Sequence, residues 1–133
     1  MSQPQLDELD QAMGLFVRGD ASAATSLWLP TEDVTFFGAF GGYERGWKQV
    51  RPRLAWAASQ FRDGTWACEQ LSAHFGAEVG YTVGIEHARA TIGGSPGRQD
   101  LRVTHIFCCV DGTWQMVHRH ADPLTGKAAP SAR

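Results

Sequence analysis

Hydrophobic side chains near the start of the chain recur at the spacing of a helix. Leu6, Leu9, Met13 and Phe16 are three or four positions apart, so one face of a helix would carry all of them. Gly19 follows, and a glycine can end a helix in the left-handed conformation. The spacing therefore predicts a first helix that ends shortly before Gly19.

Two further helical segments are predicted. The second covers about residues 21–28 and is stopped by Pro30, because proline has no backbone N–H to continue a helix. The third runs from about 47 to 61, and Pro52 is compatible with it because it lies in the first turns. The buried stripe of the third helix would consist of Val50, Leu54, Ala57, Ala58 and Phe61.

Strand-like segments lie on both sides of the third helix. A short strand is predicted at residues 34–37, and the glycines at 38, 41 and 42 permit a sharp reversal after it. Beyond residue 64 the apolar and polar positions alternate, with breaks at Gly76, at 93–97 and at 111–112. The longer strands are predicted near 66–75, 79–92, 100–110 and 114–121.

Helices first and consecutive strands afterwards are typical of an α+β domain. We expect a cone-shaped roll, in which three N-terminal helices pack on a strongly curved antiparallel sheet and leave a pocket inside the cone. The chain has 133 residues and no internal linker, which favours one domain. We assign that domain to residues 1–123 and expect 124–133 to form a flexible tail.

Composition narrows the classes of function. The net charge is −2 and basic residues do not cluster, so we expect neither nucleic acid nor an anionic membrane as a partner. No apolar run approaches the roughly 18 residues of a spanning helix, and the first residues do not resemble a secretory signal. The three cysteines lack the C-x-x-C spacing of zinc sites, which favours a reducing compartment. We therefore expect a cytoplasmic protein without a metal or cofactor.

Several short segments carry a resemblance to a known family. They are DVTFFG at 33–38, GW at 46–47, LRVT at 101–104, DGTW at 111–114 and VHRHAD at 117–122. Over about residues 6–123 the chain resembles the SnoaL-like proteins of the nuclear transport factor 2-like superfamily, which includes ketosteroid isomerases, polyketide cyclases and scytalone dehydratase. The last strand also resembles the association domain of calcium/calmodulin-dependent kinases. The resemblance implies the fold, but this fold supports enzymes, carriers and assembly modules alike.

The ketosteroid isomerase residues implied by the resemblance are missing. An alignment on Gly19-Asp20 puts Ala12 where that family has the tyrosine that stabilises the enolate. Phe37 stands at about the position of its general-base aspartate. Neither side chain can transfer a proton or donate a hydrogen bond, so catalysis here would require other residues.

Alternation along the strands predicts which side chains face the pocket. If the turn at 111–113 pairs Val110 with Trp114, His105 lies opposite Arg119 on an otherwise apolar face. In the kinase association domain the position of His105 is a pocket arginine, which supports the same assignment. A buried Arg119 either binds an oxygen of a ligand or pairs with a carboxylate, and His105 either takes part in chemistry or bonds to the backbone.

The opposite, even-numbered face is predicted to form an isologous homodimer interface, because it is both polar and aromatic. His118 and His120 could instead bind a metal with Asp122 or Glu86, but a hydrogen-bond cluster in the interface is the preferred interpretation. The predicted interface residues are Trp114, Met116, His118 and His120.

The leading hypothesis is a small-molecule binder or cofactor-independent enzyme of the isomerase, cyclase or dehydratase type. His105 would move the proton and Arg119 would stabilise charge on the oxygen of an apolar or enol-like ligand, with Asp122 as a third catalytic group. The alternative is a non-catalytic ligand sensor or homo-oligomeric assembly module. The residues expected to line the pocket are Phe37, Tyr43, Trp47, Trp56, Tyr81 and Phe107.

Overall fold

The computed structural model describes residues 1–130, apart from the side chains of residues 3 and 4. Within them the chain forms the helices α1 (Gln3–Phe16), α2 (Ser22–Ser26) and α3 (Trp47–Ser59). The strands are β1 (Thr35–Phe37), β2 (Glu44–Arg45), β3 (Phe61–Phe75), β4 (Val79–Ile92), β5 (Ser95–Val110) and β6 (Thr113–Pro123).

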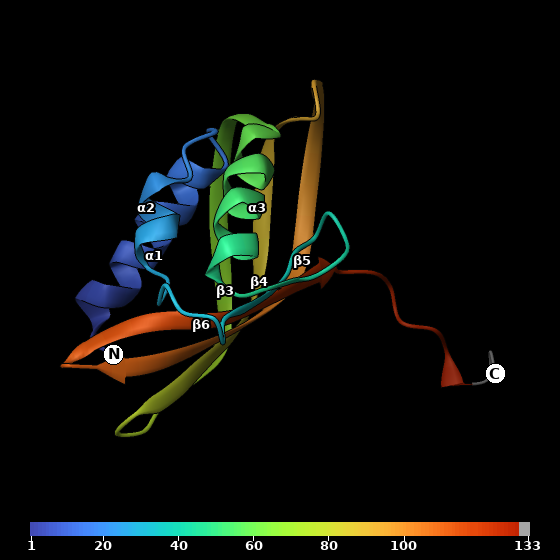
Figure 1. Ribbon diagram of the computed structural model, residues 1–133. Coiled ribbons are helices and arrows are strands. Elements are labelled where there is room, and N and C mark those ends of the chain that lie inside the picture. The colour runs from blue at the N-terminus through green and yellow to red at the C-terminus, as the bar shows by residue number, and fades with distance from the viewer. Residues whose placement is uncertain (131–133) are drawn as a thin grey trace.

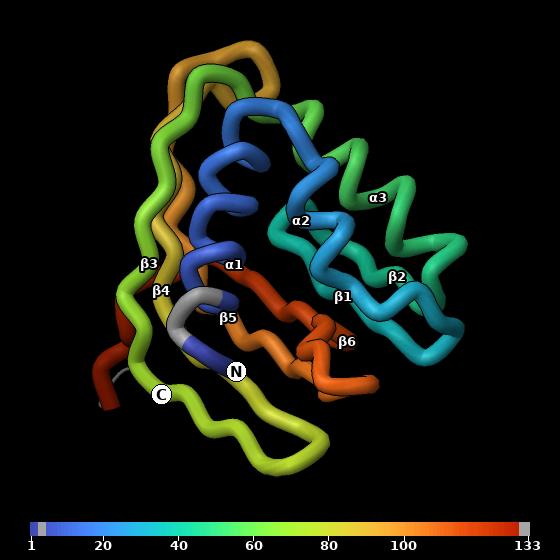
Figure 2. The backbone as a smooth tube through the Cα atoms, turned by 90° about the vertical axis from the view of Figure 1, so that its left-hand side faces the viewer, coloured from blue at the N-terminus to red at the C-terminus, as the bar shows by residue number. Residues whose placement is uncertain are grey.

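The strands form one curled, open sheet in the order β2-β1-β6-β5-β4-β3 (Figure 1). The sheet wraps around α1 and α2, and α3 lies across the open side next to them (Figure 2). The predicted α+β architecture with helices on a curved sheet is therefore confirmed. One pairing departs from the expected antiparallel pattern, because β1 runs parallel to β6. The chain between these two strands contains α3 and four other strands, so no hairpin turn forces them to be antiparallel.

The predicted face of α1 packs into the core. Leu9, Met13 and Phe16 are each 8% exposed, as the helical spacing requires. Gly64 lets the end of α1 approach β3 closely, because a Cβ at this position would lie 2.2 Å from the carbonyl oxygen of Val17. The backbone N–H of Gly64 donates to that oxygen at 3.1 Å. The contact fixes the distance between α1 and the sheet, and with it the width of the interior.

The turn between β4 and β5 sets which side chains face the helices. Gly93 and Gly94 form a two-residue turn with φ of 58° and 89°, which side chains other than glycine rarely adopt. Ile92 therefore pairs with Ser95. The register places even-numbered residues of β4 beside odd-numbered residues of β5, and both sets face the helices. The break expected at residues 93–97 would give a longer turn, and Tyr81 would then face the pocket; the two-residue turn shows that this assignment is wrong for β4.

The pairing of His105 with Arg119 is confirmed, although the turn differs from the one assumed. The turn consists of Asp111 and Gly112 alone, so Val110 pairs with residue 113 rather than 114. An irregularity in β6 between the partners of Ile106 and Phe107 then shifts the register by one residue. The two differences compensate each other, and both side chains reach the concave face.

The remaining boundaries differ in detail from the prediction. The chain leaves α3 at Ser59 and enters β3 at Phe61, so β3 starts earlier than expected, and the short β2 was not predicted. Residues 124–129 form neither helix nor strand, and the last part of the predicted tail, 131–133, lies outside the described residues. None of the helices within residues 1–130 has the length and apolar composition that crossing a bilayer requires.

Candidate functional site

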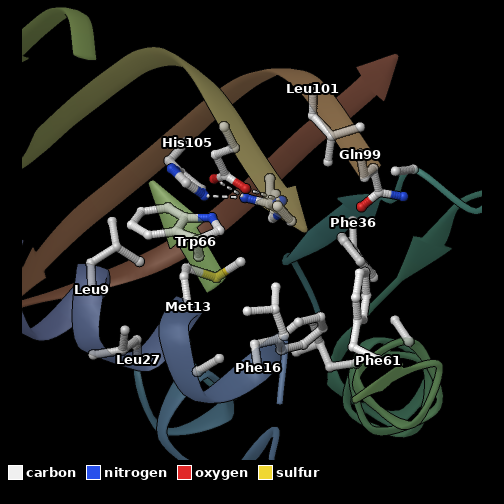
Figure 3. A pocket seen from close by; sticks show the side chains of 18 of the residues that line it. Leu9, Met13, Phe16, Leu27, Phe36, Phe61, Trp66, Gln99, Leu101 and His105 are labelled. Carbon is white, nitrogen blue, oxygen red and sulfur yellow. Dashed lines mark hydrogen bonds and ion pairs between the residues drawn. The ribbon is translucent and has the colours of Figure 1, made fainter. Parts of the chain in front are cut away.

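A cavity of about 50 Å³ lies between the concave face of the sheet and the helices. Figure 3 shows that apolar side chains of α1 form one wall and that a group of charged side chains from the sheet closes one end. This volume is smaller than the 150 Å³ of an engineered cavity that holds benzene. The apolar lining residues are Leu9, Met13, Phe16, Val17, Ala24, Leu27, Trp28, Phe36, Ala39, Phe40, Leu54, Ala57, Phe61, Ala88, Leu101 and Met116.

The charged end of the cavity is a bidentate ion pair. Arg119 Nη1 donates to Glu86 Oε2 at 2.7 Å, and Nη2 donates to Glu86 Oε1 at 2.9 Å. Glu86 is 4% exposed and Arg119 9%, so both charges are almost completely removed from water. A pair of this geometry neutralises the guanidinium within the protein itself. The site as a whole therefore has little net charge with which to attract an anion.

His105 joins this pair and its tautomer follows from the contacts. Arg119 Nη1 lies 2.9 Å from His105 Nε2, and a guanidinium can only donate, so Nε2 accepts. The proton of the neutral ring is then on Nδ1, which lies 3.2 Å from Thr82 Oγ1 and donates to it. We call the resulting set of Thr82, His105, Arg119 and Glu86 the inner cluster.

The charges and the burial of the inner cluster fix the protonation states of His105 and Glu86 at neutral pH. Burial and the adjacent guanidinium lower the pKa of His105 to about 3, because both disfavour a second positive charge. Burial raises the pKa of Glu86, but the charge and hydrogen bonds of Arg119 outweigh it and lower the pKa below the usual value. At neutral pH the cluster thus consists of a carboxylate, a guanidinium and a neutral imidazole.

Trp66 adds a buried N–H group that lacks a hydrogen-bond acceptor of normal geometry. Its indole nitrogen is buried and points toward the inner cluster (Figure 3). The N–H contributes to the lowered pKa of Glu86, yet it makes no hydrogen bond of normal geometry to any described residue. In addition, two of the five N–H groups of Arg119 have no partner among the described residues. Unused donors therefore remain at this end of the cavity.

A groove of about 230 Å³ leads to the inner cluster from outside. It lies between α1 and strands β3, β4 and β5, and it shares Leu9, Trp66, Glu86 and His105 with the cavity. Cavity and groove together offer the room for a ring that the cavity alone lacks. The remaining groove residues are Leu6, Asp10, Cys68, Gln70, Thr82, Val83, Gly84 and Val103.

Two groove residues have shifted acidities. Partial burial and the nearby carboxylates of Asp7 and Glu86 raise the pKa of Asp10. Burial and the charge of Glu86 raise the pKa of Cys68 to about 11, so its thiol stays protonated and unreactive at neutral pH. Neither residue stands out in the sequence, because each is an ordinary polar residue until the fold brings α1 against β3 and β4.

The predicted pocket pair His105 and Arg119 does line the cavity, with the two nitrogens at 2.9 Å. Glu86, in contrast, was assigned to the opposite face, and the structure corrects this: the two-residue turn at Gly93-Gly94 brings it beside Arg119. The alternative in which Arg119 pairs with a carboxylate is therefore the observed one. His105 bonds to a side-chain hydroxyl rather than to the backbone.

None of the six residues predicted to line the pocket does so. On the convex face, Phe37 packs edge-on against Tyr43 and His118, whereas its neighbour Phe36 faces the cavity. Tyr81 also lies on that face, because β4 has the opposite parity to the one assumed.

The other three aromatic residues pack elsewhere. Trp47 contacts Trp28 at the edge of the core, and it is Trp28 that lines the cavity. Trp56 is 42% exposed and stacks under the guanidinium of Arg53. Phe107 is buried against Phe75 and lies outside the cavity.

The remaining predicted residues divide between the core and the convex face. Asp122 is outside the cavity and binds Arg102 Nε at 2.8 Å, so it is not a third member of the inner cluster. Met116 is 3% exposed in the core and cannot form part of an interface, and Trp114 packs against Phe75. His118 bonds to Thr35 at 2.7 Å on the convex face.

His120 lies on the convex face with His118, and the two ring centroids are 6.4 Å apart. The nearest carboxylate is that of Asp122, whose Oδ2 lies 3.6 Å from His120 Nε2. Among residues 1–130 no group of three or more His, Cys, Asp or Glu side chains is arranged to hold a metal ion.

The neutral state of His105 predicts a specific dependence of stability on pH. Its pKa is about 3 in the folded chain and about 6.5 in an unfolded chain, so between these values the unfolded state binds more protons. The free energy of unfolding should therefore fall with decreasing pH, by up to about 1.4 kcal/mol per pH unit from this residue. Glu86 adds to the fall below its unfolded pKa, because its folded pKa is lowered.

Urea denaturation of wild type and His105→Gln from pH 7 to pH 4 measures this effect. The glutamine can still accept from Arg119 but does not titrate, so the variant should have a shallower pH dependence even if it is less stable at every pH. His74→Gln changes an exposed histidine and serves as the control. Equal slopes for wild type and His105→Gln would contradict the assignment of a buried neutral imidazole.

Comparison with solved structures places this architecture among known folds. A nuclear transport factor 2-like superfamily protein from Salmonella enterica superposes with a TM-score of 0.74 at 15% identity, covering 96% of this chain and 97% of that one. A Streptomyces avermitilis protein of the NTF2-like family, described provisionally as a dehydratase, gives 0.76 at 15% identity, with 92% and 96% covered. A Thiobacillus denitrificans protein, described provisionally as a calcium/calmodulin-dependent protein kinase type II association domain, gives 0.72 at 17% identity, with 90% and 92% covered.

These identities are low, so the structural likeness establishes the fold and no more. No functionally curated protein matches the chain by sequence. A sequence profile of the SnoaL-like domain, however, matches residues 7–124, which span both the helical layer and the whole sheet that enclose the inner cluster. The chain therefore belongs to the SnoaL-like domain family, with the nuclear transport factor 2-like fold.

Proposed function

We propose that this protein binds a small, mostly apolar ring compound that carries a neutral carbonyl or hydroxyl oxygen. The observation that supports this most is the buried indole N–H of Trp66, which has no proper acceptor among the described residues. A buried donor without a partner costs about 1–3 kcal/mol, and a ligand oxygen would remove that cost. The donor lies where the groove meets the cavity, so the ring would occupy the groove and its oxygen would reach the inner cluster.

The charges of the inner cluster favour a neutral ligand over an anion. Glu86 already balances the charge of Arg119 through two hydrogen bonds. A carboxylate or enolate entering beside Glu86 would meet like charge, whereas a carbonyl oxygen would only accept from the remaining N–H donors. The sequence-based expectation of an enol-like ligand changes accordingly. The ligand that we propose is a neutral ketone, aldehyde or alcohol.

The geometry argues against proton transfer by His105. Its Nε2 lone pair accepts from Arg119, and a pKa of about 3 makes the ring a weak base. His105 would instead orient Arg119, and Thr82 would in turn orient His105.

A matched pair of probes tests the binding proposal. 2-Tetralone and tetralin have the same fused rings, but only the ketone offers an acceptor, so wild type should bind 2-tetralone about 10-fold more tightly, as one net hydrogen bond allows. Trp66→Phe keeps an aromatic ring and removes the N–H, and the preference should then nearly disappear. Trp56→Phe alters an exposed tryptophan on α3 and is the control. Isothermal titration calorimetry measures both affinities. If neither compound binds, or if Trp66→Phe keeps the preference, the proposal is wrong.

A second candidate function is self-assembly through the convex face of the sheet. No helix within residues 1–130 covers this face (Figure 1), and it carries exposed Leu71, Val79, Tyr81 and Phe37. The Arg102–Asp122 pair adds both signs of charge to the same surface, which suits a two-fold contact with a second copy of the chain. We propose a homodimer in which these residues, with His118 and His120, form the contact.

Sedimentation equilibrium tests the homodimer. Wild type should be dimeric at micromolar concentration, and Tyr81→Lys should shift it toward monomer, because a buried charge without a partner opposes association. Leu15→Lys introduces the same charge at a partly exposed apolar residue of α1 and should leave the dimer intact. A monomeric wild type would overturn this proposal without affecting ligand binding in the groove.

A further inference from the structure

Among the described residues, one polar side chain lines the cavity without belonging to the inner cluster or to the groove. It is Gln99 on β5. Figure 3 shows Gln99 and Phe36 on one side of the cavity and His105 on the other. The amide of Gln99 makes no hydrogen bond to any residue that the structure describes. A primary amide has two N–H donors and an accepting oxygen, so all of these are open to a ligand or to water.

The strand register places Gln99 at a defined distance from the inner cluster. Glu86 pairs with Leu101, and Gln99 precedes Leu101 by two residues on the same face of β5. Diagonal neighbours of this kind are about 7 Å apart. Directly opposite Gln99 is Ala88, which has no polar group in its side chain. On the other side β6 ends at Pro123, the partner of Leu101. The pairing of the strands therefore does not use the amide.

The space between the inner cluster and Gln99 suits a short chain of atoms rather than a ring. The cavity has a volume of about 50 Å³. A single buried water needs about 10–15 Å³, so the cavity has room for roughly three or four heavy atoms. Its walls near Gln99 are apolar and include Phe36, Ala88 and Leu101. A chain of CH₂ groups would therefore fill the space, with the inner cluster at one end and the amide at the other.

We propose that Gln99 binds a hydroxyl group at the end of a short aliphatic arm of the ligand. The ring of the ligand lies in the groove, and its carbonyl oxygen accepts from the N–H of Trp66. The arm extends from the carbonyl carbon through the cavity to Gln99. This inference rests on the proposed function, because it takes the position of the carbonyl group from it. The class of ligand narrows to ring-bearing ketones whose second substituent is a hydroxyalkyl chain of about three carbons.

An uncharged end group fits this position better than a charged one. Among the described residues that line the cavity, the charged side chains are Glu86 and Arg119, and they pair with each other. A charged end group would therefore lack a counter-ion, and burying such a charge is costly. A hydroxyl group can donate to an amide and accept from it, so it replaces the water that the arm displaces. A methyl group would leave the amide of Gln99 without a partner.

Two phenyl ketones that differ only in the hydroxyl group test this inference. In 1-phenylbutan-1-one the arm ends in a methyl group, and in 4-hydroxy-1-phenylbutan-1-one the same carbon carries the hydroxyl. Wild type should bind the hydroxy ketone about fivefold more tightly, the usual net value of one hydrogen bond. Gln99→Leu keeps a side chain of similar size without an amide, so the ratio of the two affinities should fall to one or below. Isothermal titration calorimetry measures both affinities.

Two further variants complete the test. Gln60→Leu is the matched control, because Gln60 follows α3 and lines neither the cavity nor the groove, and it should keep the fivefold ratio. Gln99→Asn draws the amide back by one carbon and should lower the ratio, which gives a second measurement if Gln99→Leu does not fold. Urea denaturation shows whether each variant is folded.

The possible outcomes separate this inference from the binding proposal. If wild type binds 2-tetralone but does not prefer the hydroxy ketone, or binds neither phenyl ketone, the inference is wrong and the binding proposal stands. Folded Gln99 variants that keep the full preference also overturn the inference. If wild type binds no ketone, 2-tetralone included, the proposed function fails, and the inference fails with it.

Discussion

The buried pair of Glu86 and Arg119 is the interaction on which the arrangement of the site depends. Two charges that are 4% and 9% exposed are stable in the interior only when each satisfies the other. The pair joins β4 to β6. His105 lies on β5, between these two strands, and its hydrogen bond to Arg119 ties β5 to the pair. The registers of three strands must therefore be correct at once for this end of the cavity to exist.

The same pair determines which chemistry the site favours. Because Glu86 neutralises Arg119, the cavity offers hydrogen-bond donors without net positive charge. The neutral state of His105 follows from the same guanidinium, which occupies its lone pair and opposes protonation. A bound carbonyl or hydroxyl oxygen would therefore meet hydrogen-bond donors at the inner cluster, whereas His105 is a weak base.

The sequence predicted the fold better than the site, for reasons of geometry. Helical spacing around Leu9 and the presence of strands β3 to β6 depend on local pattern, and both were predicted. The partner of Arg119 depends on whether the turn before Ser95 has two residues or more, since one residue reverses the face of every side chain on β4. Phe36 and Phe37 illustrate the same sensitivity, because only the former faces the cavity. Trp66 acquires its place at the end of the cavity only when α1 and β3 come together.

A double-mutant cycle tests most directly whether the Glu86–Arg119 pair organises the site. Glu86→Leu or Arg119→Met alone leaves a buried charge without its partner, and each should lower the free energy of unfolding by about 3–5 kcal/mol. The double variant should lose far less than the sum, because two apolar side chains then pack where the ion pair was. Urea denaturation at neutral pH gives all four values. Single losses that are small, or that simply add in the double variant, would contradict the account.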